Sequence, residues 1–152
     1  MTPVFKKLNL KEQHEILLVN APLTFAPHLA ELEGITIQQQ LGEINEIHFS
    51  LAFVTQQKEL DALATEIMVK AKGDALIWFA YPKQSSKKYR CDFNRDNGWN
   101  LLGNGGFEAV RQIAIDEDWS ALRFRRTAFI KSITREPKRV LSSEGKARVL
   151  NK

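Results

Sequence analysis

The sequence predicts an α/β fold: a mostly parallel sheet with helices on both faces and an antiparallel hairpin at its C-terminal end. Residues 75–81 form a continuous apolar run that stops abruptly at Pro82, which is typical of a strand buried on both faces of a parallel sheet. Apolar residues from Leu60 to Ala71 recur at helical spacing and indicate an amphipathic helix. Two strand-like segments near the C-terminus are separated only by the acidic turn 116–118, so we expect them to pair as a hairpin.

The other predicted elements complete a β-α-β-β-α-β-α-β-β order. We expect strands over residues 15–20, 35–38, 48–54, 74–81, 107–115 and 119–127. A first helix, 28–33, is bracketed by Pro27 and Gly34. A second runs from residue 57 to about residue 73 with Thr55 as its N-cap, and a third covers 97–102 with Asp96 as its cap. Right-handed crossovers then give the parallel strand order 2-1-3-4 with the hairpin beyond strand 4, a small Rossmann-like sheet.

The length and the charge distribution predict one domain with a basic extension. The chain has 152 residues, of which 43% are hydrophobic and 26% charged, and this is enough for one compact core. The net charge of +4 is concentrated in residues 131–152, which hold seven Lys or Arg and two Glu. We therefore expect a single domain over 1–130 and a basic C-terminal extension over 131–152. Since the remainder is slightly acidic, nucleic-acid binding by the folded core is not favoured.

The same sequence favours a cytoplasmic protein. Its single cysteine, Cys91, excludes an internal disulfide framework and suits a reducing compartment. The N-terminal residues lack the apolar segment of a signal peptide, and no apolar run approaches the roughly 20 residues that span a bilayer. We expect no contact with a membrane.

The turn after the first strand argues against a standard cofactor site. Residues 20–28 contain no glycine, and Pro22 and Pro27 lack the N–H groups that cradle a phosphate or approach a nucleoside closely. The second strand ends in glutamines, where a ribose normally requires an acidic residue. The three histidines show no metal-ligand spacing. The sequence therefore predicts no bound cofactor and no metal.

Donor groups gather just after the fourth strand, at the edge of the sheet where α/β folds keep their sites. This rim supplies cations, hydroxyls and backbone donors within a few residues, and it could hold an anionic group. The predicted contact residues are Tyr81, Lys83, Ser85, Ser86 and Lys87. Strand alternation places Arg123 and Arg125 on one face of the last strand, where they are further candidates. We expect one arginine of this strand to pair with Asp92, Asp96 or Asp116.

The chain resembles known proteins in two respects. The strand order, with a glycine-flanked helix leading into a final hairpin, resembles the layout of class I methyltransferases at the level of the fold. The strand end ALIWFAYPK and the segment VRQIAIDEDWSALRFR, residues 75–83 and 110–125, resemble a family of small bacterial proteins catalogued only as a domain of unknown function. That resemblance implies a cytoplasmic bacterial protein of this fold, and it implies no particular activity.

Three functional hypotheses follow. The first is a non-catalytic binding or regulatory module that contacts an anionic group on a protein, nucleotide or metabolite through the rim of strand 4. The alternative is a divergent methyltransferase-like enzyme, whose ligand would lie over Asn20, Thr55 and Tyr81 at the carboxyl ends of the strands. The third is nucleic-acid binding through the basic loop and residues 131–152.

Overall fold

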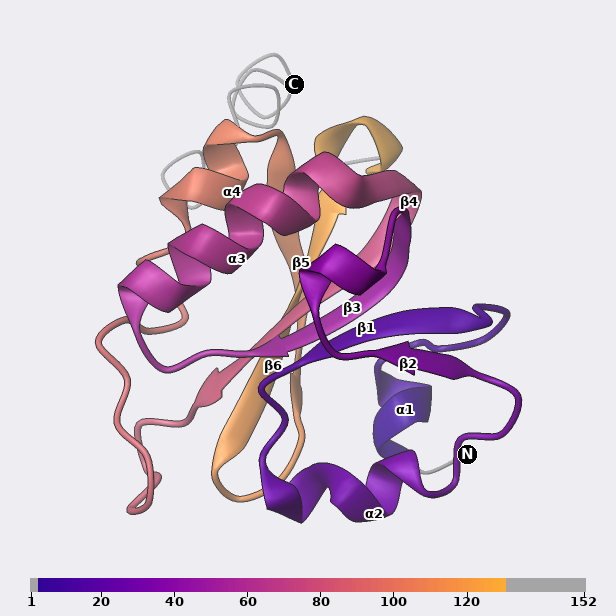
Figure 1. Ribbon diagram of the computed structural model, residues 1–152. Helices are drawn as coiled ribbons and strands as arrows, with labels where there is room; N and C mark the ends of the chain where they lie inside the picture. Colours follow the sequence, from indigo (N-terminus) through magenta and orange to yellow (C-terminus); the bar gives the residue numbers. More distant parts are fainter. Residues whose placement is uncertain (1–2, 131–152) are drawn as a thin grey trace.

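The computed structural model describes residues 3–130, which form a six-stranded sheet in the order β2-β1-β3-β4-β6-β5 (Figure 1). Strands β1 to β4 are parallel, whereas β6 runs antiparallel to both β4 and β5. The predicted parallel order and the terminal hairpin are therefore confirmed. The strands are β1 (Glu15–Val19), β2 (Thr36–Gln38), β3 (Ile47–Phe53), β4 (Ala71–Pro82), β5 (Phe107–Ala114) and β6 (Trp119–Arg126).

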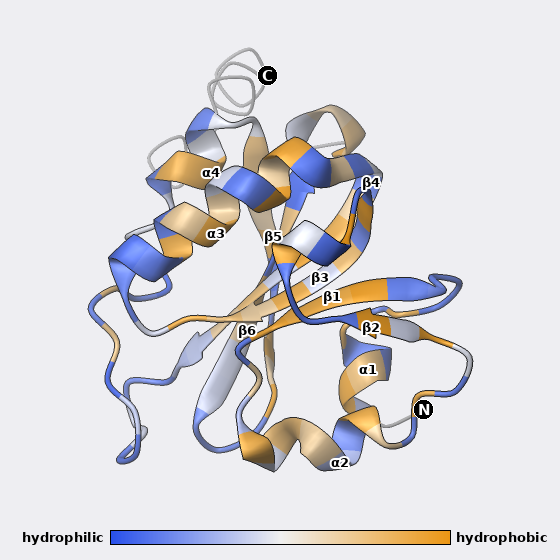
Figure 2. Cartoon of the chain, viewed as in Figure 1, coloured by the Kyte–Doolittle hydropathy of each residue, from blue (hydrophilic) through white to orange (hydrophobic). Residues whose placement is uncertain are grey.

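Helices cover both faces of the sheet. The helices α3 (Gln57–Lys70) and α4 (Asn100–Asn104) lie on one face, and α1 (Pro3–Lys7) and α2 (Ala26–Leu29) lie on the other (Figure 1). Around its axis α3 alternates between hydrophilic and hydrophobic residues, as an amphipathic helix should (Figure 2). Three short 3₁₀ turns complete the fold: Leu23–Phe25, Leu41–Glu43 and Thr127–Phe129. None of the helices in the described part of the chain is long and apolar enough to cross a bilayer.

Strand β4 separates two hydrophobic cores. Ile77 and Phe79 face the core beneath α3 and α4, while Leu76 and Trp78 belong to the core beneath α1. The indole N–H of Trp78 donates to the carbonyl of Leu8 at 2.9 Å, so its polar atom is satisfied in the interior. The apolar run at residues 75–81 is therefore buried on both faces, as its composition predicts.

Several element boundaries differ from the prediction. The helix expected over 28–33 is the shorter α2, preceded by a 3₁₀ turn, and α1 has no counterpart in the prediction. Helix α3 ends at Lys70, and β4 begins with the next residue. Residues 72–74 then interrupt the regular pairing of β4 with β3, and Gly73 in this segment has a positive φ. Gln57 and Asn100 begin α3 and α4 after the N-caps Gln56 and Trp99.

Neither predicted helix cap is correct. The Thr55 side chain does not cap α3; instead its backbone N–H donates to Glu59 Oε1 at 3.0 Å. The N–H of Gln57, in the first turn of the same helix, donates to Asp92 Oδ1 at 2.6 Å. Asp96 caps no helix, since α4 starts four residues later. The carboxylate of Asp92, which is remote in sequence, thus accepts a hydrogen bond from the N-terminus of α3. No local sequence pattern can indicate such a contact.

Candidate functional site

Two pockets lie side by side along the edge of the sheet where the parallel strands end. The larger, which we call the loop cavity, has a volume of about 930 Å³ and is lined by the end of β4, most of residues 83–97, Gln112 of β5 and Ser120 of β6. The smaller, which we call the switch-point pocket, has a volume of about 440 Å³ and lies over the ends of β1 and β3. Tyr89 lines both pockets, so the two adjoin.

The switch-point pocket follows from the topology of the sheet. From β1 the chain crosses to β2 on one side and then to β3 on the other, and the crevice between β1 and β3 is where open α/β sheets hold ligands. Asn20, directly after β1, has a φ of 59°, in the left-handed region that asparagine tolerates better than most residues. This conformation turns the chain sharply and places Asn20 in the wall of the pocket.

A carboxylate is held in the wall of the switch-point pocket. Glu59, in the first turn of α3, accepts the Thr55 N–H through Oε1 at 3.0 Å and the Asn20 side-chain amide through Oε2 at 3.4 Å. The carboxylate therefore bridges the segments that follow β1 and β3. Each carboxylate oxygen has a second lone pair, so Glu59 can still accept from a ligand.

A buried aromatic ring forms part of the wall of the switch-point pocket. Trp119, the first residue of β6, lines the pocket although it is only 4% exposed. Its ring contacts Phe53 and Tyr89, at centroid distances of 5.0 and 4.8 Å. Its indole N–H is buried without an acceptor within residues 3–130, which costs about 1–3 kcal/mol. Because this nitrogen has almost no accessible surface, the pocket is offered the ring of Trp119 and not its N–H.

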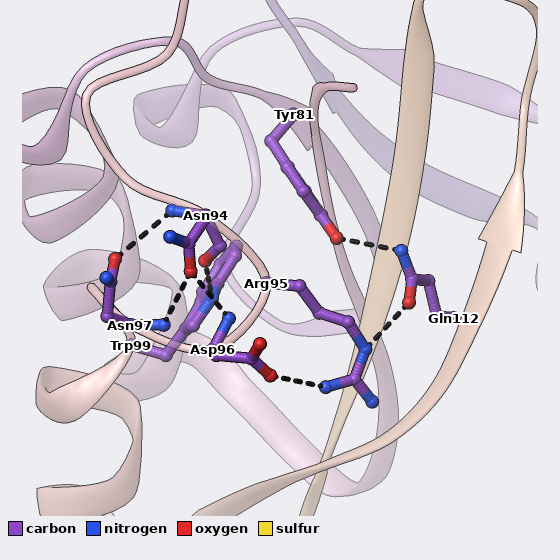
Figure 3. Close-up of polar contacts among 7 residues, drawn as sticks. All are labelled: Tyr81, Asn94, Arg95, Asp96, Asn97, Trp99 and Gln112. Atoms are coloured by element: carbon purple, nitrogen blue, oxygen red, sulfur yellow. Dashed lines mark hydrogen bonds and ion pairs between the residues drawn. The ribbon is translucent and has the colours of Figure 1, made fainter. Parts of the chain in front are cut away.

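The loop cavity contains a chain of polar contacts (Figure 3). The Gln112 side-chain amide donates to the Tyr81 hydroxyl oxygen at 2.9 Å, and Arg95 Nε donates to the Gln112 carbonyl oxygen at 2.7 Å. Arg95 Nη1 lies 3.2 Å from Asp96 Oδ1. Burial raises the pKa of Tyr81 to about 12, and burial also raises the pKa of the Cys91 thiol in the same cavity. Both groups are therefore protonated near neutral pH.

The loop cavity brings together four of the five predicted rim residues. Tyr81, Lys83, Ser85 and Ser86 line the cavity, whereas Lys87 is exposed and lies outside its lining. Tyr81 is buried, with only 4% of its surface exposed, so it forms the floor of a pocket and not an open contact surface. The Ser86 hydroxyl donates to Asp118 Oδ1 at 2.9 Å and accepts the N–H of Tyr89 at 3.2 Å, which fastens the loop to the hairpin turn.

The two predicted arginines of the last strand lie apart from these pockets. Arg123 and Arg125 line neither pocket. The strands β4 and β6 are antiparallel, so Trp119 lies beside the C-terminal end of β4, whereas the later residues of β6 lie nearer the N-terminal end of β4. Arg125 forms a bidentate pair with Asp74, at 2.8 and 2.6 Å, and this hydrogen bonding lowers the pKa of Asp74. The expected pairing of one arginine with a carboxylate is therefore confirmed, but the partner is not Asp92, Asp96 or Asp116: it comes from the irregular start of β4.

Glu59, Arg95, Gln112 and Trp119 belong to the site but were not predicted from the sequence. Glu59 has the pattern of an ordinary acidic residue in a first helical turn, and Gln112 that of an exposed position of a strand. Arg95 is one of several cations in a polar loop, with nothing local to mark it. Within the part of the chain that the structure describes, no three His, Cys, Asp or Glu side chains gather as a metal site would require.

Comparison with solved structures identifies the fold. The chain is similar to a SAM-dependent methyltransferase from Aquifex aeolicus, with a TM-score of 0.61 and 15% identity over 80% of this chain and 87% of that one. It is also similar to a ribosomal protein L11 methylase from Lactobacillus delbrueckii subsp. bulgaricus, with a TM-score of 0.52 and 12% identity over 81% and 77% of the two chains. The fold is thus the Rossmann-like fold of these methyltransferases.

The comparisons by sequence give no family. No family model matches the chain, and no curated protein matches it in sequence. The resemblance to a bacterial family of unknown function therefore stays a prediction. At these identities the solved structures define the fold alone, and activity must be argued from the two pockets.

Proposed function

We propose that the chain is a group-transfer enzyme of the methyltransferase type, with a donor in the switch-point pocket and an acceptor in the loop cavity. The observation that carries this proposal is the adjacency of the two pockets, which meet at Tyr89. A transferase must hold two reactants side by side in a fixed orientation, and two adjoining pockets on one sheet edge suit that task. The methyltransferase fold of the solved structures also favours an enzyme over a non-catalytic binding module.

The side chains of the switch-point pocket suit S-adenosylmethionine, although the backbone does not offer a glycine-rich approach. Glu59 provides a carboxylate for a cationic or hydroxyl group, and Asn20 provides an amide. The Trp119 ring lines the same pocket and provides an aromatic surface. When bound, S-adenosylmethionine supplies an electrophilic methyl group. Pro22 stands in the wall in place of a backbone donor, so we expect the side chains to carry most of the affinity.

A binding measurement tests this proposal. Titration calorimetry with S-adenosylmethionine should give saturable binding, and Glu59→Gln should weaken it at least tenfold because the charge is lost while the shape is kept. The matched control is Glu66→Gln, an exposed carboxylate of the same helix, which should stay within twofold of the wild type. Absence of binding at about 1 mM ligand, where even weak complexes are populated, would overturn the proposal.

A second readout separates an enzyme from a binding module. Incubation with S-adenosylmethionine that carries a labelled methyl group, together with extracts of small molecules or proteins, should label an acceptor, and Glu59→Gln should reduce that labelling. Saturable binding with no labelled product would instead support the binding module predicted from the sequence.

A further inference from the structure

We propose that the loop cavity binds the carboxylate or phosphate group of a small molecule at the Arg95 guanidinium, beside the Tyr81 hydroxyl that shares the Gln112 amide with it. That this molecule is the acceptor of the transferred group rests on the proposed function. The binding of the anion itself does not. The sequence predicts anion binding by Tyr81, Lys83, Ser85, Ser86 and Lys87, with Arg123 and Arg125 as further candidates. The proposed site keeps Tyr81 and adds Arg95, an arginine that the sequence does not single out.

The loop that carries Arg95 is held by several hydrogen bonds. Asn94 Oδ1 accepts the N–H groups of Asp96 and Asn97, at 2.8 and 3.1 Å, and the Asn94 carbonyl accepts the indole N–H of Trp99 at 2.8 Å. Trp99 is itself buried in the core beneath α3 and α4. Figure 3 shows these contacts, which link the backbone on either side of Arg95 to a residue of the hydrophobic core.

The Arg95 side chain is held in place yet keeps free donors. Its Nε donates to Gln112 and its Nη1 to Asp96, which uses two of the five N–H groups of a guanidinium. The other three have no acceptor among residues 3–130. A guanidinium held in place loses little entropy when it binds, and its planar array of donors suits two oxygens of one anion.

Gln112 determines the orientation of the Tyr81 hydroxyl. Because the Gln112 carbonyl accepts from Arg95, its NH₂ group must be the one that faces Tyr81, and the tyrosine oxygen is the acceptor. The hydroxyl proton of Tyr81 then points elsewhere, and no acceptor for it lies in the described part of the chain. Burial keeps this hydroxyl protonated, so it is a neutral donor beside a cation.

The charges around the cavity favour an anion. Lys83 and Arg90 line it without a carboxylate partner in residues 3–130, while both of its aspartates are already engaged. Asp92 accepts the first-turn N–H of Gln57, and Asp96 lies against Arg95. The lining holds the cations Lys83, Arg90 and Arg95 against the two aspartates, so it has one cation in excess, and an anionic ligand would compensate it.

The test is an NMR titration of the full chain with two simple probes, sodium acetate and inorganic phosphate, at constant ionic strength. At least one probe should shift the Arg95 Nε–H and Gln112 NH₂ resonances saturably. Saturation by acetate alone assigns the group as a carboxylate, and saturation by phosphate alone as a phosphate. If neither probe shifts these resonances saturably, the inference is wrong.

Variants locate the effect. Arg95→Lys keeps the charge but loses the planar donors, and the apparent Kd should rise at least tenfold; Tyr81→Phe should raise it about threefold. Lys88→Ala, which removes an exposed cation of the same loop outside the cavity, should stay within twofold. An Arg95→Lys protein with native indole resonances and unchanged binding would overturn the inference. Should that variant not fold, Tyr81→Phe decides alone. The resonances followed here belong to residues of the loop cavity, and S-adenosylmethionine binding is measured separately, so failure here and failure of S-adenosylmethionine binding are separate results.

Discussion

The two pockets share one sheet edge but differ in what builds them. The switch-point pocket is made by the topology: Asn20 and Thr55 follow parallel neighbouring strands, and Trp119 begins the strand beside β4. The loop cavity is made by one long connection, residues 83–99, which returns over the ends of β4 and β6. The first pocket therefore depends on the fold itself, whereas the second depends on local hydrogen bonds that could change without unfolding the sheet.

This difference suggests a division of roles. A pocket formed by strand ends is rigid and common to the fold, and in a transferase it suits the donor. A cavity closed by a sequence-specific loop can vary in shape and charge, and it suits the acceptor. Tyr89 belongs to the loop yet contacts Trp119 of the sheet at a centroid distance of 4.8 Å, so it is the point where the two meet.

The strongest test of the comparison is Trp119→Ala. If the switch-point pocket is inseparable from the core, removal of this buried ring should lower the free energy of unfolding by about 3–5 kcal/mol, because a large cavity opens against Phe53 and Tyr89. Urea denaturation measures it. Trp119→Phe is the control: it keeps an aromatic ring and removes the unpartnered N–H, so it should cost less than half as much. A loss below about 1 kcal/mol in the alanine variant would show that this pocket is not part of the core.

The corresponding change in the loop cavity is Asn94→Ala. We expect a loss of about 1 kcal/mol in the free energy of unfolding, since two backbone N–H groups lose their side-chain acceptor at a partly exposed turn. The larger effect should be on anion binding, which should weaken about fivefold as Arg95 loses its support. Titrations with phosphate and with S-adenosylmethionine measure both pockets. Asn104→Ala, an exposed asparagine at the end of α4, is the control, and weakened binding of both ligands would refute the independence of the pockets.

Sequence reasoning located residues of both pockets. Four of the five predicted rim residues line the loop cavity, and Asn20 and Thr55, named for the alternative enzyme, line the switch-point pocket. Parallel order follows from crossover handedness, and once the order is known, Asn20 and Thr55 must meet at the same edge. Tyr81 was expected with them, but it faces the core beneath α3 and α4 and lines the neighbouring cavity. Side chains alternate between the two faces of a strand, so Tyr81 lies on the same face of β4 as Ile77 and Phe79.

The contacts of the loop cavity could not be predicted in this way. Arg95 and Gln112 are 17 residues apart and belong to a loop and a strand, so no periodicity relates them. The partner of Arg125 was missed for a similar reason: Asp74 lies in the segment where β4 loses its regular register with β3, and an alternating pattern carries no information on such an interruption. The predicted basic extension, 131–152, lies outside the described residues.

The smallest expected effect is that of Asp74→Asn, at the end of the sheet away from both pockets. The Asp74 and Arg125 side chains are each about one third exposed, at 34% and 32%, so loss of the pair should cost less than about 1 kcal/mol near neutral pH. Arg125 lowers the pKa of Asp74 in the folded protein, below its ordinary 3.8. The pair therefore contributes its full stability above that ordinary value and loses it as the pH falls through the lowered one. Urea denaturation of the wild type and of Asp74→Asn at several pH values should show a difference in the free energy of unfolding that vanishes in acid. The other carboxylates are the same in both proteins, so their titration does not affect this difference. A difference that grows as the pH falls would contradict the pair, and a change in the binding of either ligand would contradict the separation of this end of the sheet from the two pockets.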